Sequence, residues 1–318
     1  MLKYSLVPGG SEPLSIASTA RASDDAAQRE SDDPWFTEFG SGKLATVGRN
    51  GTLQELAQFQ VEQSELAVPI GPKPPLVLSI SPLDVIVVGH DAVWFTEPTN
   101  RRIGSYASGK LTLYAATMTG APLMVASGPH GSLWFTETVS GRIAKFQDGS
   151  FQEFADSLSA SSPITLGKGS VGNAVMPARI AVASDGTVYF TRNWAIAVCD
   201  SRIGELQSTG KISYLHTPTP RAGVADVTIG PDGYPWFTEY CANKLGHFTA
   251  SGQIEEFPVP TANSGPLGIA ATSDGALFAE HKSGKIGFYG WRIVVPSHGD
   301  PGQTSNAASV HLKGAGST

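Results

Sequence analysis

The sequence is short of charge, of cysteine and of long apolar runs. Charged residues make up 16% of the 318 residues, against about 25% in an average protein. The formal net charge is −6 without a basic cluster, which argues against nucleic acid or an anionic membrane as partner. No run of about 18 apolar residues exists that could span a bilayer. Two cysteines, Cys199 and Cys241, are too few for a disulfide framework.

Glycine, proline and apolar residues are abundant instead. Gly 36 and Pro 22 indicate many turns, while 41% hydrophobic residues suffice for a sizeable core. Coiled coils, collagen and extensive disorder are excluded by this composition. Residues 1–8 lack the apolar stretch of a secretory signal, so we expect a cytoplasmic location. We also expect a monomer whose partner is a small-molecule substrate.

A tetrapeptide close to Trp-Phe-Thr-Glu recurs six times. The copies occupy residues 35–38, 94–97, 134–137, 189–192, 236–239 and 277–280. Their starts are separated by 59, 40, 55, 47 and 41 residues, which gives a basal period near 40 with insertions. A period of about 40 residues is typical of the blades of a β-propeller.

The best-formed repeat, residues 224–257, reads as four short strands separated by turns rich in Gly, Pro, Asn and Asp. The sequence therefore predicts an all-β propeller of four-stranded antiparallel blades, six most simply, with seven as the alternative. The longest interval is too short to hide a further blade. We expect one propeller domain over residues 1–296 and a flexible tail over 297–318. Either residues 4–8 or residues 292–296 would supply the strand that closes the ring, and we favour 4–8.

The repeat resembles that of the virginiamycin B lyase (streptogramin B lyase) family. The likeness runs from about residue 2 to residue 288 and is carried by segments such as 265–269, 232–233, 236–239 and 243–246. The resemblance implies a seven-bladed propeller that opens a cyclic depsipeptide antibiotic by metal-assisted elimination. It also implies catalytic histidines in Pro-His-x-Ile segments that open the innermost strands, and a carboxylate after a Trp-Phe-Ala-x segment.

This chain departs from that pattern at the histidines. The corresponding residues are all Leu or Ala, namely Leu14, Leu83, Leu123, Ala178, Ala225 and Leu267. His281 stands where the family's carboxylate would follow residues 277–280. We therefore do not carry over the streptogramin lyase activity itself.

The glutamates that end five of the repeats allow two interpretations. A ring of carboxylates would suit Mg²⁺ or Ca²⁺, and Mg²⁺ is the cofactor that this interpretation would imply. The alternative, which we favour, is a structural cross-strand ion pair, because a base follows each glutamate by five residues. These pairs are Glu38 with Lys43, Glu97 with Arg102, Glu137 with Arg142, Glu239 with Lys244, and Glu280 with Lys285.

The fourth repeat breaks this pairing. Arg192 replaces the glutamate and Arg202 is the following base, so we expect Asp200 to neutralise one arginine and leave the other to bind an anion or a carbonyl. The apolar insertion 193–199 would be a lid over a hydrophobic ligand, or would pack on a neighbouring loop.

The candidate site lies on the funnel face, where the loops between second and third strands meet the starts of the innermost strands. Asp84, Arg179 and Asp226 occupy the third position of these starts, where they need a ligand or channel-lining ion pairs, such as Arg179 with Asp226. His281 has a side chain suited to general acid or base catalysis. The predicted catalytic residues are His281, Arg192, Arg179, Asp226 and Glu239. The predicted substrate-binding residues are Trp194, Tyr240, Cys241, Asp84, Met124, Glu97 and Glu137.

Three functions remain open at this point. The first is a streptogramin-lyase-like enzyme that carries out elimination, isomerisation or cyclisation on a bulky apolar small molecule, cyclic peptide or lactone. Arg179 and Arg192 would polarise a carbonyl, and His281, Asp226 or Glu239 would move the proton. The second is a propeller that binds a ligand or peptide without catalysis. The third is a lactonase-like or strictosidine-synthase-like enzyme.

Overall fold

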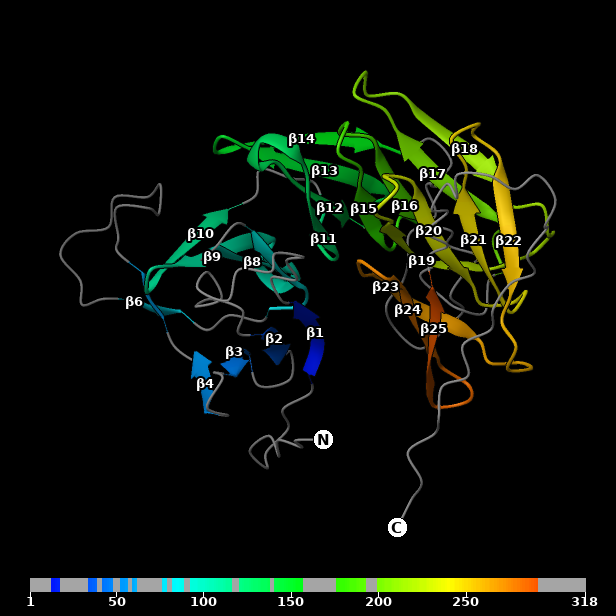
Figure 1. Cartoon of the computed structure of the whole chain (residues 1–318). Helices are drawn as coiled ribbons and strands as arrows, with labels where there is room; N and C mark the ends of the chain where they lie inside the picture. Colours follow the sequence, from blue (N-terminus) through cyan, green and yellow to red (C-terminus); the bar gives the residue numbers. More distant parts are fainter. Residues whose placement is uncertain are drawn as a thin grey trace, which may run out of the picture.

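Six antiparallel sheets arranged around a centre form the computed structural model of the chain (Figure 1). The structure describes residues 13–17, 34–38, 42–47, 52–56, 59–61, 76–78, 82–88, 92–115, 120–137, 140–156, 176–192 and 199–290. Each copy of the repeated tetrapeptide forms the second strand of a sheet or its end. The predicted six-bladed, all-β propeller is confirmed.

Five blades have four strands in chain order from the centre outward. Blade 1 contains β1 (Pro13–Ala17), β2 (Trp35–Glu38), β3 (Lys43–Val47) and β4 (Leu53–Leu56). Blade 2 contains β7 (Val85–Val88), β8 (Ala92–Glu97), β9 (Arg102–Ala107) and β10 (Lys110–Ala115). Blade 3 contains β11 (Val125–Ser127), β12 (Leu133–Glu137), β13 (Arg142–Gln147) and β14 (Ser150–Ala155).

The remaining three blades continue around the same centre (Figure 1). Blade 4 contains β15 (Ile180–Val182), β16 (Val188–Thr191), β17 (Arg202–Leu206) and β18 (Ile212–His216). Blade 5 contains β19 (Val224–Ile229), β20 (Pro235–Glu239), β21 (Lys244–Phe248) and β22 (Ile254–Pro258). Blade 6 has three strands among the described residues: β23 (Pro266–Ala271), β24 (Gly275–Glu280) and β25 (Lys285–Gly290).

In each blade a phenylalanine of the second strand lies against a small residue of the third strand. Phe95 of the second strand pairs with Gly104 of the third, and a Cβ placed on Gly104 would lie 2.2 Å from the Phe95 ring. The same close approach occurs in blades 4, 5 and 6, and alanine replaces the glycine in blades 1 and 3. A larger side chain would push the ring out of the core.

Adjacent blades share their cores. The Phe of a second strand packs against the preceding blade, whereas the residues on either side of that Phe face the following blade. Phe135 of blade 3, for example, packs with Ile103 of blade 2, and Trp134 and Ile143 of blade 3 pack with Phe190 of blade 4. Burial of these forward-facing residues therefore requires a following blade.

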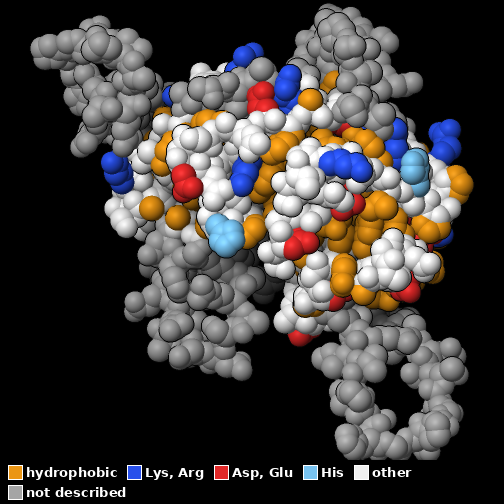
Figure 2. All heavy atoms as spheres, turned by 90° about the horizontal axis from the view of Figure 1, so that it is seen from above, with side chains coloured by type: hydrophobic (Ala, Val, Ile, Leu, Met, Phe, Trp, Pro, Cys, Tyr) orange, Lys and Arg blue, Asp and Glu red, His pale blue; other side chains and the backbone are white. Residues whose placement is uncertain are grey.

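Two features lie outside the repeat. β5 (Phe59–Val61) and β6 (Leu76–Leu78) form a two-stranded sheet within the insertion between blades 1 and 2, which the sequence did not predict. Residues 4–8 and 292–296, the two candidates for the closing strand, lie outside the described residues, as does the expected tail. Among the described residues no helix is long and apolar enough to cross a membrane. The outer rim seen in Figure 2 mixes apolar, acidic and basic side chains.

Candidate functional site

A β-bulge opens the innermost strand of the blades. In blade 2 the Leu83 N–H donates to the Thr96 carbonyl, and the Thr96 N–H donates to the Asp84 carbonyl. Leu83 and Asp84 therefore both lie opposite Thr96. Blades 3 and 4 repeat this pattern, and the strand register shifts at the same place in blades 1, 5 and 6. A bulge redirects a side chain that would otherwise follow the strand alternation. The residues in the second bulge position are Ser15, Asp84, Met124, Arg179, Asp226 and Gly268.

The threonine of the repeat fixes each bulge and joins it to the next blade. Thr96 Oγ1 accepts from the Asp84 N–H at 3.2 Å and donates to the Leu123 carbonyl of blade 3 at 2.6 Å. Thr37, Thr136, Thr191 and Thr238 donate in the same way to Leu83, Ala178, Ala225 and Leu267. These acceptors occupy the positions at which the lyase pattern has histidine. The bulge residues are thereby held at equivalent places around the centre.

Both aspartates of the bulge ring bind backbone of the following blade. Asp84 Oδ2 accepts from the Val125 N–H at 2.8 Å, and Asp226 Oδ2 accepts from the Ile269 N–H at 3.1 Å. Asp226 Oδ1 accepts from the Val227 N–H. These backbone hydrogen bonds fix the orientation of both carboxylates.

Arg179 is exposed, whereas Asp84, Met124, Asp226 and Gly268 of the same ring are buried or half-buried. The expected ion pair with Asp226 does not form within 4.0 Å, and Arg179 Nη1 lies 3.0 Å from Met124 Sδ of blade 3 instead. Burial raises the pKa of Asp226 to about 6, and the charge of Arg179 opposes this rise while that of Asp84 adds to it. The three charged groups therefore share one electrostatic environment.

The predicted register of the glutamates and bases is confirmed in all five blades that carry them, but the predicted ion pair forms in one. In blade 2 Glu97 binds Arg102 through two hydrogen bonds, of 2.6 and 2.8 Å, and also accepts from Asn100. In blades 1, 3 and 5 the base contacts a second glutamate on the fourth strand. These contacts are Lys43 with Glu55, Arg142 with Glu153, and Lys244 with Glu256.

The second glutamate changes the state of the first. Burial raises the pKa of Glu239 to about 8, and the negative charge of Glu256 adds to the shift. Burial likewise raises the pKa of Glu137 to about 7, with Ser140 as a stabilising hydrogen-bond donor and Glu153 as a repelling neighbour. Both side chains are fully buried, and burial favours the protonated, neutral form of a carboxyl group.

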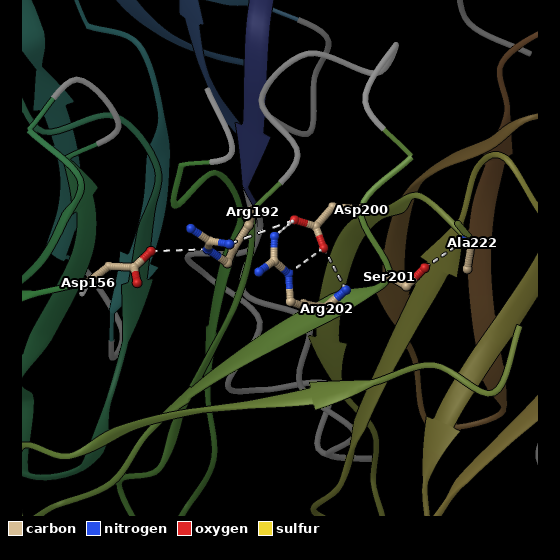
Figure 3. A network of polar contacts seen from close by, with 6 residues as sticks. All are labelled: Asp156, Arg192, Asp200, Ser201, Arg202 and Ala222. Atoms are coloured by element: carbon tan, nitrogen blue, oxygen red, sulfur yellow. Dashed lines mark hydrogen bonds and ion pairs between the residues drawn. The ribbon is translucent and has the colours of Figure 1, made fainter. Parts of the chain in front are cut away.

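Arg192 is buried in an ion-pair network, which contradicts the expectation that one of the two arginines is free for a ligand (Figure 3). Arg192 Nε lies 3.0 Å from Asp156 of blade 3, and Arg202 binds Asp200 at 2.7 and 2.9 Å. The Arg192 guanidinium also lies over the Tyr214 ring, 5.1 Å from its centroid. Its 1% exposure leaves no surface for a substrate.

The two cysteines form a disulfide between the loops of blades 4 and 5. Their Cα atoms are 6.0 Å apart, within the range of disulfide-bonded cysteines. Cys241, which was predicted to bind substrate, is therefore part of a disulfide and not a free thiol. Disulfides are rare in reducing compartments, which weighs against the expected cytoplasmic location.

His281 and Tyr240 lie together at the edge of the site, with ring centroids 6.1 Å apart, and the Lys282 ammonium lies over the Tyr240 ring. His281 is exposed. Trp194 lies outside the described residues. Among the residues that the structure describes, no group of three or more His, Cys, Asp and Glu side chains could hold a metal ion.

Several acidic partners of the basic residues were not predicted from the sequence. Asp156 follows the outermost strand of blade 3 and forms an ion pair with Arg192, a contact that the sequence did not predict. Glu55, Glu153 and Glu256 recur at one position of the fourth strands, which was the available signal that the bases have a second partner.

These features define a class: an antiparallel β-propeller whose inner-strand bulges present polar side chains at its centre. The sequence model of the virginiamycin B lyase family matches residues 170–295. A catalytically inactive virginiamycin B lyase from Staphylococcus aureus, solved with quinupristin, is 24% identical, with a TM-score of 0.64 over 91% of this chain and 87% of that one. A streptogramin B lyase structure is 26% identical, with a TM-score of 0.63 over 90% and 85% of the chains. The chain is a virginiamycin B lyase-like propeller.

A gluconolactonase from Xanthomonas campestris shares the fold alone, at 12% identity and a TM-score of 0.50 over 85% of this chain and 83% of that one. No curated protein sequence matches the chain.

Proposed function

We propose that this chain is a small-molecule enzyme that binds a bulky apolar ligand with a carbonyl or carboxylate group, such as a cyclic peptide or lactone, and moves a proton on it. The observation that carries the proposal is the placement of Arg179 and Asp226 on equivalent bulges of adjacent blades without an ion pair between them. Arg179 would bind the oxygen of the ligand, and Asp226 would be the proton acceptor. Elimination, isomerisation and cyclisation all need these two roles.

The chemistry of Asp226 supports this assignment. A pKa of about 6 leaves both protonation states populated near neutral pH, which suits a general acid or base. Gly268 of the next blade leaves space beside the carboxylate, since a Cβ there would approach Asp226 Oδ2 no closer than 3.8 Å. A reacting group of the ligand would lie in this space. Activity that requires the carboxylate should rise as the pH increases through about 6.

The test combines a binding screen with turnover of the ligands that bind. Cyclic depsipeptides, lactones and polyketides would be screened by thermal shift, and products identified by mass spectrometry. Asp226→Asn should lower kcat at least a hundredfold and change Kd by less than about threefold. Arg179→Met should weaken binding about tenfold or more, and Gly268→Val should block it. Asp232→Asn, in an exposed turn at the other end of blade 5, is the matched control. Unchanged turnover in Asp226→Asn would refute the catalytic role.

A propeller that binds the same ligand without catalysis is the second candidate. The observation that favours it is the replacement of the lyase histidine by Leu or Ala in all six repeats. Tight binding without any product, abolished by Gly268→Val, would establish this alternative. In either case we propose that the partner is a small molecule bound by the monomer, and not nucleic acid or a membrane.

A further inference from the structure

The exposed charges of the propeller are separated by sign between its two ends. In an antiparallel blade, the loop between the second and third strands and the connection to the next blade lie at the same end as the start of the innermost strand, which is the funnel face. No exposed aspartate or glutamate lies at this end among the described residues. The exposed lysines and arginines there are Arg101, Arg179, Arg221, Lys282 and Lys285.

The opposite end carries the exposed acids. The turns between first and second strands, or between third and fourth strands, contain Asp148, Asp185, Asp232 and Asp274. Glu255 lies near the start of β22, also toward this end, and Lys110 and Lys211 are the exposed bases there. The chain has a net charge of −6, so the basic funnel face is not a consequence of the overall composition.

The exposed bases of the funnel face are not neutralised by the fold. None of the five forms an ion pair with a described acidic residue, whereas the half-buried bases at the same end do, such as Arg102 with Glu97 and Lys244 with Glu256. The glutamates that end the second strands are buried and cannot screen the surface. An approaching ligand therefore meets positive charge at this end of the molecule.

Arg179 is the exposed base that belongs to the bulge ring. Its backbone N–H donates to Thr191 Oγ1 at 3.1 Å, which fixes the residue at the start of β15. Its guanidinium contacts Met124 Sδ, a weak acceptor, so most of its five N–H donors remain available. A guanidinium can donate two parallel hydrogen bonds to one carboxylate.

We propose that the ligand of the funnel face is a carboxylate anion, which the exposed bases attract and Arg179 binds. A surface of one sign raises the local concentration of oppositely charged ligands, and salt weakens the effect. A phosphate dianion is less suited, because Asp84 and Asp226 lie in the same ring and repel a second negative charge. The inference rests on the function proposed above for this site and adds the charge of the ligand to it.

The first test uses probes that share one aromatic ring system and differ in charge. Naphthoate, its methyl ester and naphthyl phosphate would be titrated by fluorescence at low and at high salt. At low salt naphthoate should bind at least about tenfold more tightly than the ester, and high salt should reduce this ratio to about two or less. Arg179→Met should remove the preference for the carboxylate and change the Kd of the ester by less than about twofold.

Two double variants separate the charge of the funnel face from the net charge of the chain. Arg221→Glu with Lys282→Glu reverses two charges at the funnel face and should abolish the preference for naphthoate over its ester. Lys110→Glu with Lys211→Glu makes the same change in net charge at the opposite end and is the matched control. It should change the preference by less than about twofold.

A second measurement reports the surface charge even if these probes bind weakly. Paramagnetic relaxation of the amide protons would be compared between an anionic and a cationic nitroxide of the same size. Amides of residues 98–101 and 281–284 should relax faster with the anionic nitroxide, and those of residues 230–234 with the cationic one.

Three results would overturn the inference: equal relaxation by the two nitroxides at the funnel face, equal binding of naphthoate and its ester, or tighter binding of naphthyl phosphate. Failure of the proposed function has a different signature. A preference for carboxylates without Asp226-dependent turnover of any ligand would support the anionic ligand and refute the catalytic role.

Discussion

The buried glutamate of blade 5 should make the protein less stable as the pH rises. Glu239 has a pKa of about 8 in the folded protein, against 4.5 for the ordinary side chain. Between these two values the folded state retains a proton that the unfolded state releases, so the free energy of unfolding falls with increasing pH. One proton corresponds to about 1.4 kcal/mol per pH unit. From pH 5 to pH 8 this group should cost about 4 kcal/mol.

Glu239→Gln removes the titrating proton and keeps the shape of the side chain. The variant should be the more stable protein at pH 8, and its stability should depend less on pH. The remaining decline would come from Glu137, whose pKa is raised to about 7, and Asp226, at about 6. Urea denaturation at pH 5 and at pH 8 measures both quantities.

Glu97→Gln provides the matched control in blade 2. Its carboxylate occupies the equivalent position but binds Arg102 directly, so the substitution leaves a partly buried guanidinium without its anion. This variant should be less stable than the parent protein at both pH values. If Glu239→Gln were destabilising to a similar degree, or if the pH dependence were unchanged, the assignment of a protonated Glu239 would be wrong.

Two further substitutions test the contacts between blades. Thr136→Val removes a buried hydroxyl that accepts from the Met124 N–H and donates to the Ala178 carbonyl, so it should lower the free energy of unfolding by about 1–3 kcal/mol. Ala279→Val, at the equivalent position of blade 6, removes no hydroxyl and should not lower it. The Cys199–Cys241 disulfide closes a loop of 42 residues, so Cys199→Ser with Cys241→Ser should cost about 4 kcal/mol, and a reductant should lower the Tm of the parent but not of this variant.

The propeller was readable from the sequence because its repeat is dictated by packing. The Phe of the tetrapeptide needs a small residue on the next strand, and Gly104, Gly246 and Gly287 each follow their Phe by nine residues (104−95, 246−237, 287−278). The spacing of Glu97 and Arg102 likewise set their cross-strand register. Such relations join residues within a hairpin, and sequence distance reports them directly.

The ionic contacts were harder to predict because their partners come from other strands and blades. Lys244 has two possible anionic partners, Glu239 and Glu256. Because its side chain is long, its ammonium group reaches the more exposed of the two, Glu256. Asp156 reaches Arg192 from the preceding blade. The disulfide depends on the 6.0 Å separation of the Cα atoms of Cys199 and Cys241, which lie in different blades, and sequence spacing does not encode that separation.

The fourth-strand residue explains why the same hairpin carries different charges in different blades. Where it is Glu256, Lys244 binds this outer glutamate, and burial raises the pKa of the inner Glu239 to about 8. Where it is Leu113, the base has one partner and binds Glu97. Where it is Tyr214, the inner position is Arg192, which gains a cation–π contact and takes its anion from Asp156 of blade 3. In these three blades the residue on the fourth strand thus decides how the charge at the inner position is balanced, and we propose that the bulge residues Arg179 and Asp226 carry the charges that act on a ligand.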